Sequence, residues 1–363
     1  MLRRIAFFIF GIAFFAGAIG LVWLDRELNR PLVLAQDQLS EEGSISLVIE
    51  QGDTLSQLVK DLADKGVLPN PLAVKLFVKA TGRGSIRAGE YRLYKDDTPL
   101  GLLDKLERGE VVDYRITFPE GWTLREWLAL LAAETHIEHE TIELSDSQIA
   151  ERLGIEYDNP EGWFSANTYY FSAGNSDLDI LAEAYQRMQE VLARQWQERA
   201  VGLPYQSPYE ALIMASIVER ETGVAEERAQ IAGVFVRRLQ KPMRLQTDPT
   251  VIYGLGERYR GNITRSHLRE ATPYNTYIID GLPPGPIANP GDDAIRAALH
   301  PAGGDKLYFV AKGDGYHQFS ATLAEHQKAV QRYQINRKRR TYRSSPVEGK
   351  SGGEKQEASG GVP

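Results

Sequence analysis

The sequence predicts an α+β protein with an N-terminal transmembrane helix, a small α+β module and a mixed α/β C-terminal domain. Three observations support this prediction. An uncharged apolar run lies near the N-terminus, a strand–helix–helix–strand pattern follows, and a helix after residue 207 is apolar on every side. The length of 363 residues, with 42% hydrophobic and 25% charged residues, suits a globular chain of two or three units.

The charge balance and the cysteine count exclude several classes of function. The formal net charge of -7 is unfavourable for binding nucleic acid, whose protein partners usually carry a basic face. It leaves a neutral polymer such as a glycan open. Because cysteine is absent, the chain has no disulfide, no thiolate metal site and no cysteine nucleophile.

Residues 5–24 form a run of uncharged, mostly apolar positions. As a helix this run spans about 30 Å, the thickness of the hydrocarbon core of a bilayer. Arg3 and Arg4 precede it, so the positive-inside rule places residues 1–4 in the cytoplasm and the rest of the chain outside. The alternative is a cleaved signal peptide, but the run is longer than a signal core and no A-x-A site follows it.

Two polar segments bound the region that is expected to fold. Residues 25–43 are polar and charged, and we expect them to form a stalk. Residues 336–363 hold few apolar side chains, and we expect a disordered tail there.

Residues 44–110 predict a small module of a strand, two helices and a second strand. Residues 45–50 alternate as a strand does, and Asp53 or Thr54 can cap the first helix, which ends near Gly66. The second helix and the returning strand are expected at residues 72–80 and 89–93. This order of elements resembles the LysM-like glycan-binding module, and a generic α+β spacer is the alternative.

Residues 111–155 predict a connecting subdomain. Residues 114–118 alternate as a strand does, and a helix follows to about Ala133. The turn at residues 121–124 repeats the Gly-x-Thr-Leu pattern of residues 52–55, with the same apolar spacing after it. Two copies are too few for a solenoid and indicate a duplicated strand–helix element.

The C-terminal domain, predicted over residues 156–335, contains the helix that is apolar on every side. Ser207 is a strong N-cap, Pro208 suits the first helical position, and Glu210 completes a capping box. The helix is expected to stop at Gly223. Its apolar middle predicts that it lies in the core of a sizeable domain.

Glu219 directly follows the apolar run of this helix. Helical spacing puts it on the face of Ser216, where partial removal from water favours the protonated form that a general acid needs. Glu221 lies about 200° around the helix, so Glu219 has no carboxylate partner within its own helix. The alternative is that Glu219 only forms an ion pair with Arg237 or Arg238 of the next helix.

A polar cluster follows that next helix, which is expected at residues 226–240. Gln246, Thr247 and Asp248 lie between apolar residues and ahead of Pro249. Polar groups held at such a turn are candidates for contacts with sugar hydroxyls, and a plain Asp-Pro turn is the alternative.

The run from Ser216 to Gly256, SIVERETGVAEERAQIAGVFVRRLQKPMRLQTDPTVIYGLG, carries a family resemblance. Three later blocks add to it, at residues 274–277, at 281–287, and at 307–310 with 315–319. Together and in this order they resemble the MltG-type (YceG-like) endolytic murein transglycosylases. The resemblance extends from the N-terminal apolar run to about Tyr333.

The resemblance implies that Glu219 is the catalytic residue of a lyase that needs no cofactor. Such an enzyme cleaves the β-1,4 bond between N-acetylmuramic acid and N-acetylglucosamine of nascent glycan strands. The one carboxyl would first protonate the leaving oxygen and then accept the proton of the muramic acid 6-hydroxyl. The strand would keep a 1,6-anhydro end, and its elongation would stop.

Six further residues are predicted substrate contacts: Gln246, Asp248, Asn275, Tyr277, Glu161 and His317. Glu161 is the carboxylate of a block in which the family usually has Pro-Asp where this chain has Ala166-Asn167, so no acid role is expected there. A structural histidine is the alternative for His317. The loop at residues 281–291 predicts either a wall of a glycan groove or a surface turn. His136 and His139 lack a third ligand, so no metal site is predicted.

The expected protein is therefore a single-pass protein of the inner membrane whose catalytic domain lies in the periplasm. Its expected partners are peptidoglycan glycan strands, the membrane and glycan polymerases. The main alternative is a membrane-anchored scaffold that binds peptidoglycan without cleaving it. A pyridoxal-phosphate lyase is a third interpretation, but neither Lys306 nor Lys312 has a phosphate-binding glycine loop beside it.

Overall fold

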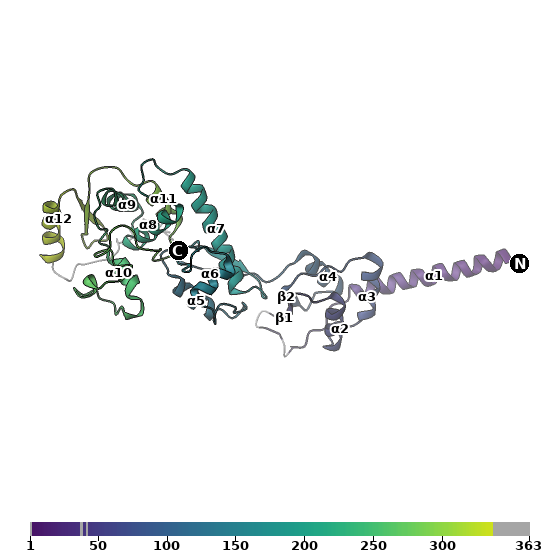
Figure 1. The fold of residues 1–363 in the computed structure, drawn as a ribbon. Helices are drawn as coiled ribbons and strands as arrows, with labels where there is room; N and C mark the ends of the chain where they lie inside the picture. The colour runs from purple at the N-terminus through teal and green to yellow at the C-terminus, as the bar shows by residue number, and fades with distance from the viewer. Residues whose placement is uncertain (1, 37–38, 41–42, 337–363) are drawn as a thin grey trace, which may run out of the picture. The chain divides into compact units, whose positions relative to one another are not determined.

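The computed structural model describes residues 2–36, 39–40 and 43–336. The fold is α+β and mostly helical, and the strands of the described residues form two-stranded sheets (Figure 1). The predicted tail at residues 336–363 lies outside the described residues from residue 337 on. No helix among the described residues is long and apolar enough to cross a membrane.

The chain divides into two compact units. The N-terminal unit comprises residues 1–116, 131–142 and 168–180, and the C-terminal unit comprises residues 117–130, 143–167 and 181–363. This division differs from the domain boundaries expected from the sequence, at residues 110/111 and 155/156. The reason is that the segment expected to connect two domains contributes residues to both.

The N-terminal unit begins with α1 (Leu2–Leu28). Leu28 and Leu32 are 3% and 4% exposed and belong to the apolar core of the following module. The backbone N–H of Leu32 donates to the carbonyl of Asp97 at 2.8 Å, and that of Val33 donates to the carbonyl of Val67 at 2.9 Å. The first part of the expected stalk is therefore packed onto the module, because its leucines supply apolar surface to that core.

The module has the predicted order of strand, helix, helix and strand. Its elements are β1 (Ser44–Ile49), α2 (Leu55–Asp64), α3 (Pro71–Thr81), β2 (Gly89–Tyr94) and α4 (Pro99–Arg108). β1 and β2 pair antiparallel, with Leu47 opposite Tyr91. Thr54 caps α2 as expected, since its hydroxyl accepts a hydrogen bond from the N–H of Gln57. Gly66 follows the helix in a left-handed conformation, with φ 73°.

A second sheet and two helices follow in the chain. They are β3 (Tyr114–Thr117), which pairs with β4 (Thr168–Phe171), α5 (Leu124–Ala133) and α6 (Asp146–Leu153). The strand and helix predicted on either side of the second Gly-x-Thr-Leu turn are therefore both present. Phe118 and Trp127 stack with ring centroids 3.8 Å apart, which fixes the start of α5 against the strand end.

The remaining elements belong to the C-terminal unit, except for the first turn of α7. They are α7 (Asp177–Gln197), α8 (Pro208–Glu221), α9 (Ala225–Gln240), α10 (Asp248–Leu255), η2 (Gly256–Arg258), η3 (His267–Arg269), α11 (Asp292–Leu299), β5 (Tyr308–Ala311), β6 (His317–Ser320), α12 (Leu323–Val330) and η4 (Gln331–Ile335). β5 and β6 form an antiparallel hairpin.

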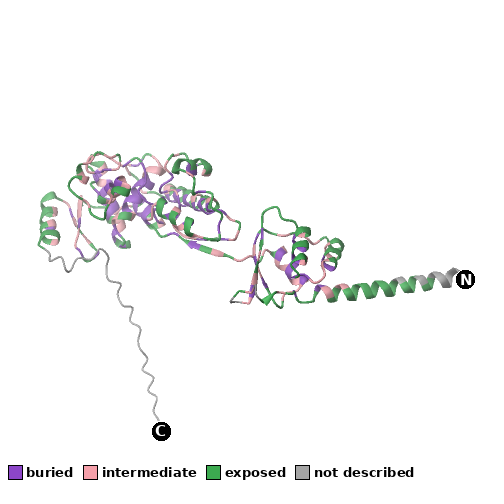
Figure 2. Ribbon diagram, turned by 90° about the horizontal axis from the view of Figure 1, so that it is seen from below, coloured by how far each residue is buried: buried purple, intermediate pink, exposed green. Residues whose placement is uncertain are grey.

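α8 is the central helix of the C-terminal unit, as its all-round apolar sequence predicts. Every residue from Ala211 to Val218 is buried, and α9, α10 and α11 pack around the helix. Figure 2 shows the buried residues concentrated in the helices at the centre of this unit. Ser207 is its N-cap and accepts a hydrogen bond from the N–H of Glu210. A polar residue beyond Val218 therefore emerges from the core at a fixed position.

Candidate functional site

The last turn of α8 brings three charged residues out of the core in succession. They are Glu219, Arg220 and Glu221. Because each residue turns the helix by about 100°, the two glutamates point to opposite sides and Arg220 lies between them. The surroundings on the two sides are different.

Glu219 faces an arginine and a backbone amide. Its side chain is 6% exposed, and one carboxylate oxygen lies 3.4 Å from Nη2 of Arg228 on α9. The other oxygen accepts a hydrogen bond from the N–H of Gly291 at 3.1 Å. The sequence offered Arg237 or Arg238 as the ion-pair partner, but both donate to backbone carbonyls instead.

Two more carboxylates surround Arg228. Glu120 lies 3.5 Å and Asp293 lies 3.8 Å from the guanidinium, whose side chain is 12% exposed. Burial, and next the negative charge of Glu219, raise the pKa of Glu120. The carboxylate of Glu120 lies against Gly291, where a Cβ has no room. Three carboxylates thus share one guanidinium on this side of α8.

Glu221 faces the polar segment that follows α9. The hydroxyl of Thr247 donates a hydrogen bond to its carboxylate. Burial raises the pKa of Glu221 to about 7, and the nearby Asp248 raises it further while Thr247 and Arg238 oppose the shift. The residue as a whole is partly exposed, as Glu219 is. A pKa near neutrality suits a general acid, because part of the group stays protonated at neutral pH.

A network of threonines fixes the polar segment beside Glu221. The N–H of Thr247 donates to Oγ1 of Thr276 at 3.0 Å, and Thr250 lies 2.8 Å from the same hydroxyl. Gln246 has a left-handed backbone, with φ 53°, although it is not glycine. Such a conformation is sparsely populated and is found at functional sites. Its side chain is exposed.

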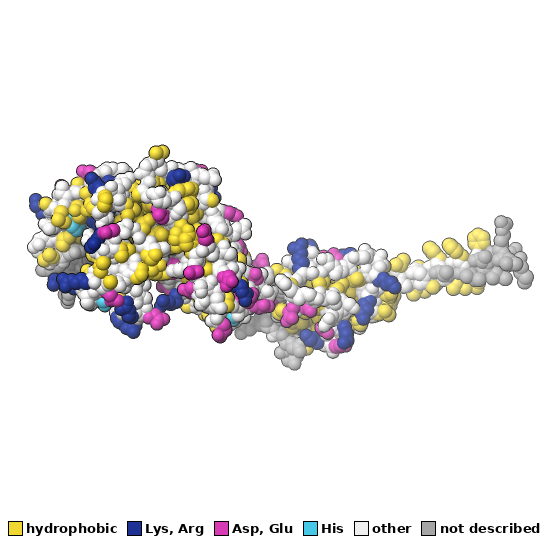
Figure 3. All heavy atoms as spheres, viewed as in Figure 1, with side chains coloured by type: hydrophobic (Ala, Val, Ile, Leu, Met, Phe, Trp, Pro, Cys, Tyr) yellow, Lys and Arg dark blue, Asp and Glu magenta, His cyan; other side chains and the backbone are white. Residues whose placement is uncertain are grey.

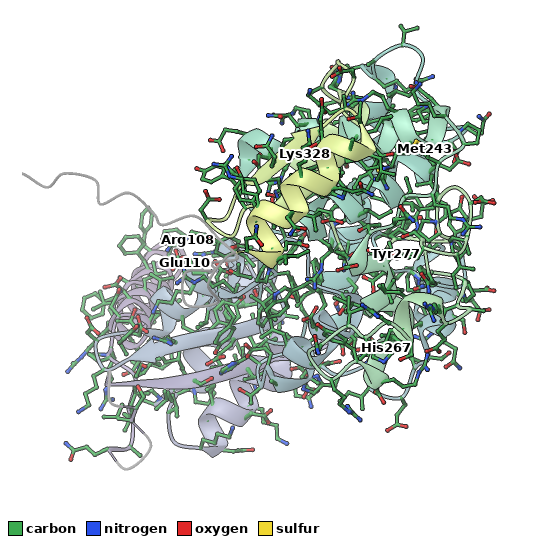
Figure 4. The ribbon with its side chains drawn as sticks, turned by 90° about the vertical axis from the view of Figure 1, so that its left-hand side faces the viewer. Arg108, Glu110, Met243, His267, Tyr277 and Lys328 are labelled. Atoms are coloured by element: carbon green, nitrogen blue, oxygen red, sulfur yellow. The ribbon has the colours of Figure 1, made fainter. Side chains whose placement is uncertain are left out.

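Asp248 and Tyr277 meet on the outer side of this segment. The tyrosine hydroxyl donates to Oδ1 of Asp248 at 2.6 Å. Figure 4 labels Tyr277 between Met243 and His267 on this side of the C-terminal unit. Asp248 begins α10, with Pro249 in the first turn, so the expected Asp-Pro turn is a helix start. The structure therefore brings Asp248 and Tyr277 together near Glu221, and Gln246 lies next to Thr247 in the chain.

Asn275 lies behind this group. It is 1% exposed, and its side-chain amide donates to the carbonyls of His267 and Glu270. Its side-chain oxygen accepts the N–H of Tyr277 at 3.0 Å. In this arrangement Asn275 holds Tyr277 in place, and its role as a direct substrate contact stays a prediction.

A cavity of about 570 Å³ opens beside the last turn of α8, and we call it the first cavity. Its lining includes Arg220, the start of α5, the middle of α10 and the turn after it: Thr123, Leu124, Arg125, Glu126, Leu128, Asp146, Glu161, Arg220, Ile252, Tyr253, Gly256 and Tyr259. Of the last turn of α8 the lining includes Arg220, which lies between the two glutamates in the chain.

Glu161 is the buried carboxyl in the wall of this cavity. It is 4% exposed, and burial raises its pKa to about 8. It accepts hydrogen bonds from the N–H of Leu124 at 2.9 Å and from the side-chain amide of Asn289 at 3.4 Å. At neutral pH the group is mostly a neutral carboxylic acid, so it does not repel a ligand that carries negative charge.

His317 belongs to a separate contact. Its Nδ1 lies 2.8 Å from Glu227 on α9, and its backbone N–H donates to the same carboxylate at 2.9 Å. The imidazole side chain is 12% exposed and packs against Phe309. This pair ties the β5–β6 hairpin to α9, and the structure does not bring His317 to the residues around Glu221.

Sequence reasoning missed two features of the site. Glu221 was noted only for lying opposite Glu219, and Glu120 was assigned no role. The charged triplet Glu219-Arg220-Glu221, which directly follows a buried run, could have indicated that Glu221 belongs to the site. All three side chains must leave the core at the same helix end. No signal in the sequence predicted that Thr247 would meet Glu221 or that Gly291 would meet Glu219.

The chain was compared with known families and proteins. Residues 47–332 match the YceG-like family. An endolytic murein transglycosylase of Bacillus subtilis (strain 168) is 32% identical over 307 residues, which cover 80% of this chain and 85% of that protein. An endolytic murein transglycosylase of Streptococcus pneumoniae is 26% identical over 306 residues, which cover 74% of this chain and 54% of that protein. The match thus spans about half of the pneumococcal relative.

One solved structure has a similar sequence. The crystal structure of a YceG-like protein from Listeria monocytogenes is 31% identical in sequence, with a TM-score of 0.48. The match covers 78% of this chain and 98% of that one. Since the family match takes in most of the residues from the N-terminal module to η4, the chain belongs to the YceG-like family.

Proposed function

We propose that the protein is an endolytic lytic transglycosylase of peptidoglycan. The observation that carries the proposal is Glu221, a carboxyl whose pKa burial raises to about 7 and which accepts a hydrogen bond from Thr247 near Asp248. The family membership and the activity of the Bacillus subtilis relative support the same chemistry.

The acid of the reaction comes from the last turn of α8. The sequence predicts Glu219 for this role, and Glu219 remains a candidate. Both of its carboxylate oxygens are already engaged, one by Arg228 and the other by the N–H of Gly291. Among the described contacts of Glu221 there is no ion pair, and burial raises its pKa to about 7. We therefore assign the proton donor to Glu221.

The reaction then needs one carboxyl and no water. Protonated Glu221 donates its proton to the oxygen between N-acetylmuramic acid and N-acetylglucosamine as the bond to C1 breaks. The resulting carboxylate accepts the proton of the muramic acid 6-hydroxyl while that oxygen bonds to C1. The products are a 1,6-anhydro end and a free 4-hydroxyl, and Glu221 regains its proton.

The neighbouring side chains would stabilise the positive charge that develops on the sugar ring. Asp248 supplies a negative charge at the start of α10, and Tyr277 orients it through the 2.6 Å hydrogen bond. Gln246 presents an exposed amide to the N-acetyl group of the substrate. A glycan strand in the first cavity would contact Glu161, Tyr253 and Arg220.

We also propose that the uncharged run at residues 5–24 anchors the chain in the inner membrane and places the catalytic unit in the periplasm. The support is the length and the apolar character of the run, with Arg3 and Arg4 before it. In that place the enzyme would act on nascent strands near glycan polymerases and end their elongation. Fusion of reporter enzymes to either end of the chain tests the orientation, and a cytoplasmic signal from the C-terminal fusion contradicts it.

The activity is tested by mass spectrometry of muropeptides. Isolated peptidoglycan is treated with the full-length protein, with Glu221→Gln and with Glu219→Gln. We expect 1,6-anhydro-muramic ends from the wild type and none from Glu221→Gln. Anhydro ends that vanish only with Glu219→Gln would assign the acid to Glu219.

The same experiment separates the rival functions. Reducing ends in place of anhydro ends would mean that water attacks C1 and that the protein is a hydrolase. Retention of peptidoglycan on the wild-type protein without any new ends would favour the binding scaffold. Circular dichroism of both variants shows whether a loss of activity comes from a loss of fold.

A further inference from the structure

We propose that a second cavity, at the opposite end of α8, binds sugars of the same glycan strand, and that a bridge of aromatic rings connects it to the first cavity. This inference rests on the proposed function, since it concerns the path of the glycan that Glu221 cleaves. It assigns a further binding site and its ligand, a stretch of β-1,4-linked amino sugars.

The second cavity lies where α8 begins. Its volume is about 520 Å³, within the range of sites for small organic ligands. The Pro-rich loop after η3 forms one wall, and the lining is Pro204, Gln206, Ser207, Tyr209, Glu210, Ile213, Leu239, Gly281, Leu282, Pro283 and Pro284. Gln206 and Pro284 are exposed. The cavity thus combines an apolar floor with hydrogen-bonding groups at its rim, as sugar sites do.

Tyrosines join the two cavities. Tyr253 lines the first cavity and lies against Tyr274, with ring centroids 4.8 Å apart. Tyr209 lines the second cavity. Between them, the hydroxyls of Tyr274 and Tyr209 both approach Gly285, and each would lie 3.1 Å from a Cβ at that position. The absence of a side chain at Gly285 therefore lets the two halves of the bridge meet.

The bridge is held in place by its own contacts. Asn159 donates to the hydroxyl of Tyr253 at 3.2 Å and approaches that of Tyr274 at 3.5 Å. The ring of Tyr209 stacks on Tyr157 at 3.8 Å between centroids, with Trp163 next to it at 5.7 Å. Each of these aromatic residues is only partly buried. Partly exposed rings that are fixed in this way lose little conformational entropy when a ligand binds to them.

Such a platform suits a glycan more than a peptide or a lipid. A pyranose ring presents C–H groups on its faces and hydroxyls on its edges, so it can stack on an aromatic ring and hydrogen-bond at the sides. The C-terminal unit displays a broad apolar area on the face seen in Figure 3. The polar rim of the second cavity, with Gln206, Ser207 and Glu210, supplies partners for hydroxyls and for N-acetyl groups.

The distance between the cavities decides how many sugars they can hold. α8 has 14 residues and is therefore about 20 Å long. A strand that occupies both cavities would extend over several sugar units along α8, from its last turn to its first. Binding over such a length favours long strands over short fragments.

The test is the dependence of binding on strand length. Uncross-linked glycan strands are separated into short (tetrasaccharide) and long fractions, and their affinities for full-length Glu221→Gln protein are measured, so that no cleavage interferes. We expect long strands to bind at least tenfold more tightly. The double variant Gln206→Ala/Pro284→Ala in the same background should reduce the ratio of the two affinities about fivefold, the effect of one hydrogen bond.

A matched control removes an exposed glutamine elsewhere. Gln327→Ala on α12 should leave the ratio unchanged. The inference is wrong if the double variant keeps the ratio of affinities measured for Glu221→Gln alone, or if short and long strands bind equally to Glu221→Gln. Failure of the proposed function has a different result: the wild-type protein then binds strands with the expected dependence on length but produces no anhydro ends.

Discussion

The two sides of the last turn of α8 present two glutamates in different surroundings. On one side, Glu219 faces the guanidinium of Arg228 and the backbone N–H of Gly291. On the other side, Glu221 accepts a hydrogen bond from the hydroxyl of Thr247, and the charges of Asp248 and Arg238 act on its pKa from farther away. What separates the two residues is the kind of group in direct contact with the carboxylate.

The contrast shows how one helix end can place two glutamates in different settings. The carboxylate of Glu219 is bound by Arg228 and by the N–H of Gly291, which ties the turn at Gly291 to α8. A carboxyl with a pKa of about 7, such as that of Glu221, changes its protonation near neutral pH and can move a proton.

Glu221→Gln should abolish the formation of anhydro ends, with a fall in rate of about 10³-fold or more, because the proton donor is removed. The variant should keep the thermal stability of the wild type or exceed it, since a buried ionisable group is replaced by a neutral one. Initial rates on long strands and a thermal scan measure both. Retention of a tenth of the rate would reject Glu221 as the acid.

Glu219→Gln should reduce the rate only about tenfold. The glutamine keeps an oxygen that can accept the N–H of Gly291, and Arg228 keeps Glu120 and Asp293. The free energy of unfolding should fall by about 1–3 kcal/mol, as expected when a mostly buried charged hydrogen bond is lost. Urea titration measures the fall. A total loss of activity with unchanged stability would reverse the roles of the two glutamates.

The pH dependence of kcat/KM should show the state of Glu221. The acid works when protonated, so the rate should fall as the pH rises through about 7. The hydrogen bond from Thr247 favours the carboxylate and so lowers the pKa of Glu221. Thr247→Val removes that bond with little change of shape, and the alkaline limb should move to higher pH by about one pH unit. A limb that stays in place would mean that another group controls it.

Gln246→Gly and Gln246→Ala should differ by about 1 kcal/mol in the free energy of unfolding, with glycine the more stable. Both remove the amide, but only glycine adopts a φ of 53° without strain. Urea unfolding of the two variants gives the difference, and their rates should fall equally. If the alanine variant is as stable as the glycine variant, the left-handed backbone at this position is not strained.

The regular elements around the site could be predicted because their signals are local. Ser207 and Pro208 fix where α8 begins, and Thr54 fixes where α2 begins. The all-apolar run predicted burial of α8, and the structure confirms it for every residue from Ala211 to Val218. Even the repeated Gly-x-Thr-Leu turn is followed by a helix in both places.

The partners of the site could not be predicted in the same way. Helical spacing tells that Glu219 and Glu221 diverge, but not that one meets Arg228 and the other meets Thr247. These contacts join residues far apart in sequence, and they depend on how α9, α10 and the loop before α11 pack around α8. Gln246, Asp248 and Tyr277 were predicted as a group and are adjacent, whereas His317 is engaged by Glu227 elsewhere.

The division of the chain into units bears on how the protein is made. The chain passes from one unit to the other at residues 116/117, 130/131, 142/143, 167/168 and 180/181. The N-terminal unit therefore lacks part of itself until residue 180 has been synthesised, although most of it precedes residue 117. Its β3–β4 sheet forms only when the late strand β4 reaches β3, and contacts between distant segments form slowly. While the chain emerges in order from a ribosome or a translocation channel, β3 remains without its partner strand. Binding of a chaperone to β3 would have its greatest effect during that interval.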